Sequence, residues 1–254
     1  MTAQDLARAL AAAGITAPAD WQEVTGSTNA TALAMARRGA PEWSIAAAAH
    51  QTAGRGRMGR VWEDVPGAAL MCSIVLRPAL RAAEAGLLTL LAGAAMAEAA
   101  EEASGLEVRC TWPNDLVVAG AKVGGILAES GIDGAALSYV AMGVGVNLEA
   151  PGEIEGAAAL GPSVDAMDLL TRFLLAFRRA YRPGDPGFPD DVVRAWTARS
   201  ATLGRTVEAL GVDGTRIAGE AVGVDRRGAL VVRTPQGERS VSSGEIEHLP
   251  RPRP

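Results

Sequence analysis

Glycine and arginine dominate one stretch of the chain, from Gln51 to Trp62, which reads QTAGRGRMGRVW. Glycine lets backbone N–H groups approach a ligand closely, and arginine presents a rigid fork of donors that matches phosphate or carboxylate oxygens. The chain carries a net charge of −5, so a loop that gathers positive charge indicates a negatively charged partner. We predict a mobile, anion-binding loop whose arginines lack an internal acidic partner; a solvated surface loop is the alternative.

The glycine spacing in this stretch also fits the G-x-G-x-x-G fingerprint of dinucleotide-binding proteins and the glycine-rich loop of protein kinases. A dinucleotide fingerprint opens a helix at its third glycine, whereas the residues after Gly59 have the pattern of an extended segment and a turn. A kinase needs H-R-D and D-F-G motifs, and the sequence contains neither. Both classes are therefore excluded.

Lysine and asparagine are scarce in this sequence. The chain has a single lysine, Lys122, and three asparagines, Asn29, Asn114 and Asn147. Arginine and alanine are abundant, a bias typical of a GC-rich genome that replaces lysine and asparagine wherever another residue serves. The four that remain are therefore candidates for functional positions.

Length, charge and cysteine content exclude further classes. The chain has 254 residues and a pI of about 5.2, which argues against a nucleic-acid-binding surface. Cys72 and Cys110 lie in apolar, strand-like runs; we expect buried thiols of a reducing cytosol, with a disulfide between them as the alternative. The longest apolar run, 85–97, is too short to span a bilayer, and no signal peptide is present. We expect a cytoplasmic protein.

Hydrophobic periodicity divides the chain into an α/β part and a β part. A linker rich in proline and glycine, at 182–189, stands between them. We predict a large domain at 1–200, a small β-barrel at 203–250 and a disordered tail at 251–254. The expected helices are 5–13, 28–38, 82–103, 165–181 and 192–199; the expected strands are 21–24, 45–49, 68–77, 106–112, 116–118, 122–129 and 137–146, then 206–210, 216–224, 229–234, 238–241 and 245–249, with a loop at 149–162.

Ser27, Thr28 and Asn29 stand between an expected strand and an expected helix. Taken alone, they have the pattern of a helix N-cap. A strand-to-helix turn is also a place where hydroxyl, amide and free backbone N–H groups converge on a small polar ligand. The next expected strand delivers Gln51 to the glycine-rich loop, so these polar groups are expected to meet.

Four blocks closely resemble the biotin protein ligases (biotin–[acetyl-CoA-carboxylase] ligases), in the order and spacing of that family: Ser27-Thr28-Asn29, GRGRMGRVW, TWPNDLVVAGAKVGGILAE and GVGVN. The resemblance covers nearly the whole chain, and the scarce lysine and asparagines all fall inside these blocks. It implies an α/β (α+β) fold, with a class II aminoacyl-tRNA synthetase-like catalytic domain built on a mixed β-sheet and a small C-terminal SH3-like β-barrel. It also implies the single-function form, without a DNA-binding domain.

The resemblance implies an enzyme that activates biotin with ATP as biotinyl-5′-AMP and transfers it to a lysine of a biotin carboxyl carrier protein domain of acetyl-CoA carboxylase or a related carboxylase. ATP, biotin and Mg²⁺ would be its small molecules. It would bind neither DNA nor membrane and would be a monomer or weak homodimer. The barrel would lie outside the pocket blocks and support ATP or carrier engagement more than biotin binding.

A carboxylate that attacks an α-phosphate brings two anions together, so the implied site must neutralise both. By resemblance Lys122 would do this as a compact point charge, a role in which arginine substitutes poorly. The implied residues are Lys122, Arg57 and Asp115 for catalysis; Ser27, Thr28, Asn29, Gln51, Gly54, Arg55, Gly56, Arg57, Lys122 and Gly125 for biotin; Arg57, Arg60, Trp62, Asn114, Asp115, Lys122 and Asn147 for ATP or the adenylate; and Asp115 as the residue nearest Mg²⁺.

Two departures from the family pattern bear on the phosphate or adenylate contacts: Thr111 stands where a basic residue is usual, and Met58 replaces a usual arginine.

Two other functions are alternatives to a biotin ligase. A lipoate or octanoate ligase of the same superfamily would take another carboxylate, but an alkyl chain would leave Ser27, Thr28 and Gln51 unpaired, whereas the ureido ring of biotin would not. A non-catalytic biotin-binding regulator would need a DNA-binding or partner module, and the sequence shows none.

Overall fold

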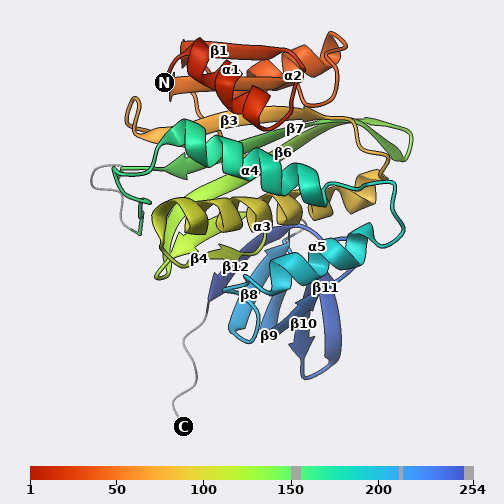
Figure 1. The fold of residues 1–254 in the computed structure, drawn as a ribbon. Coiled ribbons are helices and arrows are strands. Elements are labelled where there is room, and N and C mark those ends of the chain that lie inside the picture. The colour runs from red at the N-terminus through yellow and green to blue at the C-terminus, as the bar shows by residue number, and fades with distance from the viewer. Residues whose placement is uncertain (150–155, 212–213, 249–254) are drawn as a thin grey trace.

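The computed structural model describes residues 1–149, 156–211 and 214–248 (Figure 1). The predicted tail at 251–254, most of the first half of the predicted loop at 149–162 and the last residue of the final predicted strand lie outside the described residues. The described chain forms two β-sheets, one of seven strands and one of five.

The seven-stranded sheet has the order β1-β2-β3-β7-β6-β5-β4. Its first two strands pair in parallel and the others pair antiparallel, so the sheet is mixed, as predicted. Its strands are β1 (Ala19–Thr25), β2 (Ile45–Gln51), β3 (Ala69–Leu76), β4 (Val108–Thr111), β5 (Asp115–Val118), β6 (Ala121–Asp133) and β7 (Ala136–Asn147).

One face of this sheet is covered by three helices, α1 (Ala3–Ala12), α3 (Ala85–Ser104) and α4 (Ala166–Ala180) (Figure 1). Asp165 caps α4, because its carboxylate accepts hydrogen bonds from two backbone N–H groups of the first turn. By length and composition alone, the segment Ala82–Ser104 could cross a membrane, but 61% of its most apolar stretch is buried within the protein. It is thus the central helix of the hydrophobic core.

The opposite face of the sheet is covered only in part. Helix α2 (Thr28–Arg37) packs its small residues on one end of this face, where Val75 of β3 and Ala141 of β7 point toward it. Side chains on one face of a strand recur every second residue, so Ser73 and Gly143, which also pair with each other, follow on the same face beyond the helix. The sheet is therefore left bare next to the start of α2.

The second sheet is antiparallel, in the order β11-β10-β9-β8-β12. Helix α5 (Phe188–Thr197) precedes it. Its buried apolar residues, among them Val207 and Leu230, belong to the same core cluster as the main sheet, so the two sheets pack against one core. Its strands are β8 (Thr206–Gly211), β9 (Arg216–Val224), β10 (Leu230–Thr234), β11 (Gly237–Val241) and β12 (Gly244–His248).

Cys72 in β3 and Cys110 in β4 are free and buried, as expected from the sequence. Burial raises the pKa of each thiol to about 12, so neither forms the reactive thiolate near neutral pH while the protein is folded. We expect a maleimide reagent at pH 7 to modify neither thiol in the native protein and both after unfolding in guanidinium. Rapid modification of the native protein would contradict this arrangement.

Candidate functional site

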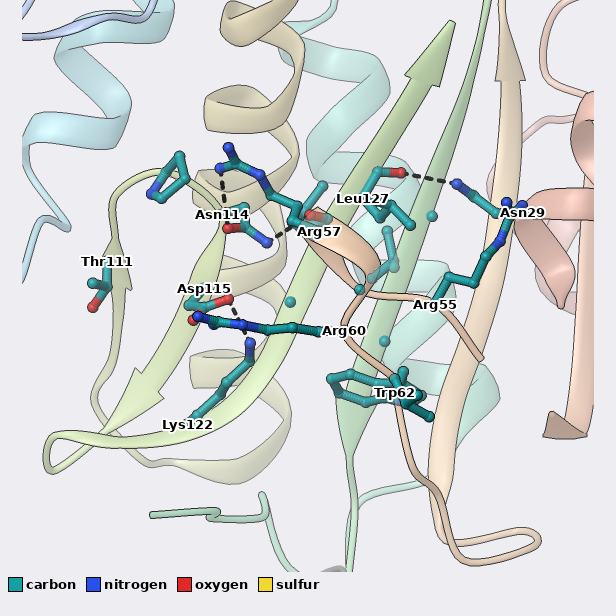
Figure 2. A pocket seen from close by; sticks show the side chains of 18 of the residues that line it. Asn29, Arg55, Arg57, Arg60, Trp62, Thr111, Asn114, Asp115, Lys122 and Leu127 are labelled. Carbon is teal, nitrogen blue, oxygen red and sulfur yellow. Dashed lines mark hydrogen bonds and ion pairs between the residues drawn. The ribbon is translucent and has the colours of Figure 1, made fainter. Parts of the chain in front are cut away.

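A cavity of about 200 Å³ lies over the bare part of the sheet (Figure 2). The glycine- and arginine-rich loop borders it on one side, and the turn that follows Trp112 borders it on the other. The structure brings most of the predicted site residues together in its lining: Ser27, Thr28, Asn29, Gln51, Arg55, Gly56, Arg57, Arg60, Trp62, Asn114, Asp115, Lys122 and Gly125.

One end of the cavity carries a chain of neutral polar groups. Gln51 Oε1 accepts hydrogen bonds from the backbone N–H (2.7 Å) and the hydroxyl (3.1 Å) of Thr28. The hydroxyl of Ser73 donates in turn to Thr28 Oγ1 over 2.9 Å. Ser27 has extended backbone geometry, but its side chain makes no capping hydrogen bond to α2, so its hydroxyl is left for the cavity. The sequence analysis missed Ser73, whose signal is a hydroxyl in the otherwise apolar, buried strand β3.

Glycines form the floor of the cavity. Gly125 in β6 is paired with Gly145 in β7, and Gly143 lies on the same face of β7. A methyl group on Gly145 would lie 2.9 Å from the ring of Trp62, and one on Gly143 would lie 2.5 Å from Asn29 Oδ1. A methyl group on Gly125 would meet nothing closer than 3.5 Å. The space above Gly125 is therefore open to a ligand.

Lys122 and Asp115 form an ion pair at the other end of the cavity, with Nζ 2.6 Å from Oδ1. Both lie in the β5–β6 hairpin, where Gly125 stands opposite Asp115 and leaves room for the two side chains. The Lys122 side chain is 43% exposed. An ammonium has three donors, and the structure gives only one of them an acceptor within the described residues, so Lys122 can still bind oxygens of an anion.

Two of the loop arginines have acidic partners on other elements. Arg55 Nη2 lies 3.2 Å from Glu129 Oε2, and Arg60 Nη2 lies 2.5 Å from Glu245 Oε1. Neither glutamate lies in the loop, and Glu245 comes from the C-terminal sheet. That the loop is mobile without a ligand stays a prediction.

Arg57, the remaining arginine of the loop, binds no carboxylate among the described residues. Its guanidinium donates to Asn114 Oδ1 (3.4 Å) and to the carbonyl oxygen of Gly244 (3.1 Å). Desolvation lowers the pKa of Arg57, although Asp115 opposes the shift. A partly desolvated cation held only by neutral acceptors gains most from an anionic ligand, which suits the predicted phosphate role.

Two buried polar atoms without a hydrogen-bond partner in the described part of the chain both belong to cavity-lining residues. They are Asn29 Oδ1 and Trp62 Nε1. A buried donor or acceptor left unpaired costs about 1–3 kcal/mol, and most such groups in folded proteins have partners. A polar ligand that supplies partners would remove this cost.

The C-terminal sheet takes part in the cavity through Gly244, Glu245 and Ile246. That this sheet supports ATP or carrier engagement more than biotin binding stays a prediction. It also supports the turn that carries Asn114: the Trp112 backbone N–H donates to Thr202 Oγ1 (2.9 Å), and its indole N–H donates to the Gly228 carbonyl (3.1 Å). These contacts join residues far apart in the sequence, so no local pattern revealed them.

Two predicted residues do not line the cavity. Asn147 is buried, and its amide donates to the Ala158 carbonyl (3.1 Å); its contact with adenine stays a prediction. Gly54 closes the base of the loop instead, because its carbonyl accepts the Trp62 N–H and a methyl group there would lie 2.4 Å from Trp62 O. Of the two residues that depart from the family pattern, Thr111 and Met58, Thr111 lines the cavity.

Residues 21–147 match the biotin/lipoate A/B protein ligase family, and residues 202–249 match the biotin protein ligase C terminal domain. The chain belongs to the biotin/lipoate A/B protein ligase family. The biotin–[acetyl-CoA-carboxylase] ligase of Paracoccus denitrificans is 36% identical over 237 residues, which cover 87% of this chain and 97% of that protein. The ligase of the same name from Mycobacterium tuberculosis is 34% identical over 239 residues, or 89% and 86% of the two chains.

Solved structures of the family share the fold. A mutant of the biotin protein ligase of Aquifex aeolicus, in complex with biotin, has a TM-score of 0.71 and 25% identity, and the match covers 91% of this chain and 97% of that one. Both the mixed sheet and the small C-terminal sheet are covered by the family matches. This confirms the predicted fold class of this biotin/lipoate ligase family member.

Proposed function

We propose that this family member is an ATP-dependent ligase that converts biotin to biotinyl-5′-AMP and transfers the biotinyl group to a lysine of a biotin carboxyl carrier protein. The observation that carries the proposal is the polarity of a single cavity. Neutral donors and acceptors gather around Thr28 and Gln51 at one end, while Lys122 and Arg57 stand at the other. Biotin has the matching pattern, a neutral ureido ring and a carboxylate.

In the first step, the biotin carboxylate forms a bond to the α-phosphorus of ATP as the bond to pyrophosphate breaks. Lys122 is proposed to contact both anions, because its compact charge reaches two oxygens without the bulk of a guanidinium. Arg57 and Arg60 would neutralise the phosphates. In the second step, the neutral amine of the carrier lysine attacks the acyl carbon, AMP departs, and the amine loses a proton.

Mg²⁺ is proposed to enter with ATP. The part of the chain that the structure describes contains no group of three or more His, Cys, Asp or Glu side chains that could hold a metal ion. Mg²⁺ commonly takes one or two carboxylates together with substrate phosphates and water, and two carboxylates line the cavity, Asp115 and Glu245, of which Asp115 is the proposed ligand. The residues present therefore fit an Mg²⁺ ion that binds together with ATP. The ion would neutralise part of the negative charge of the phosphates.

A lipoate or octanoate ligase is the second candidate, since the family includes both ligase types. The open hydroxyl of Ser27 and the polar set at Gln51 favour a ureido ring over an apolar chain. The test is biotin- and ATP-dependent labelling of a carboxyl-carrier domain, with lipoate as competitor. Labelling that depends on lipoate and not on biotin would overturn the proposal.

The proposal also includes the domain boundaries, the location, the oligomeric state and the absence of DNA binding that the sequence predicts. Residues 1–200 and 203–250 are proposed as the two domains, because each contains its own sheet. A cytoplasmic location is proposed because both cysteines are free. A monomer or weak homodimer is expected from the family resemblance, and the acidic pI argues against specific DNA binding; a sequence-specific gel shift at physiological salt would contradict the last point.

Replacing Arg57 by glycine should release the reactive adenylate into solution. The guanidinium ties the loop to Asn114 and to the C-terminal sheet, so its removal loosens the cover of the cavity. We expect increased biotinylation of bystander proteins, measured with streptavidin after incubation with biotin and ATP. Arg226→Gly is the matched control, since Arg226 is also a loop arginine bound to a backbone carbonyl but lies outside the cavity. Equal bystander labelling by both variants would show that Arg57 does not retain the adenylate.

A further inference from the structure

Glu129, near the middle of β6, has no role in the proposed reaction, yet it connects two walls of the cavity. Its Oε2 atom accepts a hydrogen bond from Asn29 Nδ2 at 2.7 Å and lies 3.2 Å from Arg55 Nη2. Asn29 belongs to the first turn of α2, and Arg55 belongs to the glycine- and arginine-rich loop. One carboxylate oxygen thus joins three elements that are distant in the sequence.

The position of this carboxylate is fixed by Asn29. The Asn29 side chain is buried, with the residue 3% exposed, and its amide nitrogen also donates to the Leu127 carbonyl at 3.3 Å. Gly143 makes the site possible, because a methyl group there would lie 2.5 Å from Asn29 Oδ1. An amide turned the other way would place its oxygen against the carboxylate and the carbonyl, so the amide orientation is determined, and with it the place of Glu129.

The position of Arg55, together with its pairing, sets it apart from the proposed phosphate end of the cavity, since pairing alone also occurs at Arg60. Figure 2 shows Arg55 beside Asn29, on the side of the cavity away from Asp115 and Lys122. Its charge is compensated there by Glu129. Arg57, which has only neutral acceptors among the described residues, is not compensated in this way. The loop arginines are therefore unequal, and Arg55 is suited to holding the loop.

Holding Arg55 also holds the cover of the cavity. Arg55 pairs with Val61 in a β-bridge, and the neighbouring Trp62 N–H donates to the Gly54 carbonyl at 3.0 Å. The Trp62 ring then lies over Gly145 on the cavity floor. A displacement of Arg55 away from β6 would be transmitted through this bridge to the tryptophan.

We propose that Glu129, held in place by Asn29, is the latch that keeps the loop closed over the neutral end of the cavity and so sets how long biotin and its adenylate are retained. The inference rests on the proposed function, since it assigns biotin to that end. Glu129 is a positioning residue: it acts through Arg55 and does not touch the reacting atoms. Its loss should change retention of the ligand more than the rate of adenylate formation at saturating biotin.

The test uses the full chain and compares wild type, Glu129→Gln and Glu129→Ala. Glutamine keeps an oxygen that can accept from Asn29 but has no charge for Arg55, whereas alanine removes both contacts. Dissociation of biotin and of biotinyl-5′-AMP is measured by competition, alongside the rate of adenylate formation at saturating biotin and ATP. We expect ligand dissociation roughly two- to fivefold faster in Glu129→Gln, the range for a partly exposed ion pair, with the saturated rate changed less.

Glu98→Ala is the matched control. Glu98 also pairs with an arginine and is 32% exposed against 30% for Glu129, but it lies on α3. Its dissociation rates should equal those of wild type. In a double-mutant cycle, Glu129→Gln should have little further effect once Arg55 is alanine, because both substitutions remove one interaction.

Unchanged ligand dissociation in folded Glu129→Gln, or effects of Glu129→Gln and Arg55→Ala that add, would overturn the latch. Both outcomes leave the proposed function intact if the wild-type protein still biotinylates its carrier. A wild-type protein that neither binds biotin nor labels a carrier would overturn the proposed function and the latch together. Should Glu129→Ala fail to fold, the glutamine variant alone decides, since it keeps the Asn29 acceptor.

Discussion

Lys122→Ala should form biotinyl-5′-AMP about 100-fold more slowly than wild type, or slower still, while remaining folded. The loss of one charge-assisted contact costs about 1.5–3 kcal/mol in binding, and removal of a donor to charge that develops in the transition state typically costs ~100- to 1,000-fold in rate. Lys122 is 43% exposed and pairs with Asp115 at the cavity edge, so folding does not depend on it. Pyrophosphate release with biotin and ATP measures the rate, and thermal unfolding measures the fold.

Lys122→Arg is the sharper variant. It keeps the charge, but its planar fork is larger than an ammonium and is less able to lie between two anions. The Lys122 Nζ and Cε atoms already lie 3.7 Å from where a Cβ atom on Gly125 would stand. We expect a defect similar to that of alanine. Near-normal adenylate formation by Lys122→Arg would show that only the sign of the charge matters. The proposed contact of the Lys122 ammonium with both anions would then be wrong.

Gly125→Val should abolish most biotin binding without destabilising the protein. A Cβ atom at Gly125 would meet no protein atom closer than 3.5 Å, and valine is favourable in a strand. The branched side chain would therefore occupy the ligand's space, next to the Asp115 and Lys122 side chains, which lie 3.5 and 3.7 Å from the Cβ position. Overpacking of a filled site costs about 1–3 kcal/mol, so the Kd for biotin, measured by calorimetry, should rise roughly 10- to 100-fold.

Gly223→Val is the control for Gly125→Val, because Gly223 also lies in a strand and has no atom near its missing Cβ. It should leave the biotin Kd unchanged. Wild-type affinity in Gly125→Val would mean that biotin lies elsewhere than on the glycine floor. A large fall in the unfolding temperature of Gly125→Val alone would instead show that the space above Gly125 is needed by the protein itself.

The secondary structure was largely predictable because its signals are local. Short apolar runs bounded by turn residues mark the strands, and Gly39 and Gly105, each at positive φ, mark helix ends. The errors fall at boundaries. Pro189 was assigned to a linker, but α5 begins at Phe188 and places this proline in its first turn, where no intrahelical N–H partner is lost. The strand predicted at 106–112 is shorter, Val108–Thr111.

The chemistry available to this protein follows from residue types and their spacing. A lone lysine, a loop of glycine and arginine, and hydroxyl and amide groups at a strand-to-helix turn are fixed by residue type and spacing. The loop indicates an anionic ligand, and the groups at the turn indicate a small polar one. Each inference depends on groups that are close together along the chain, and the binding roles of the individual residues stay predictions.

The tertiary structure decided which of these groups meet and what holds them. Four features depend on contacts between segments that are separate in the sequence. They are the bare face beyond α2, the ion pairs of Arg55 with Glu129 and of Arg60 with Glu245, and the hydrogen bond of Asn147 to Ala158. Such contacts are set by how helices and sheets pack around one core, and packing follows from the shape and burial of many side chains at once. No short stretch of sequence contains that information.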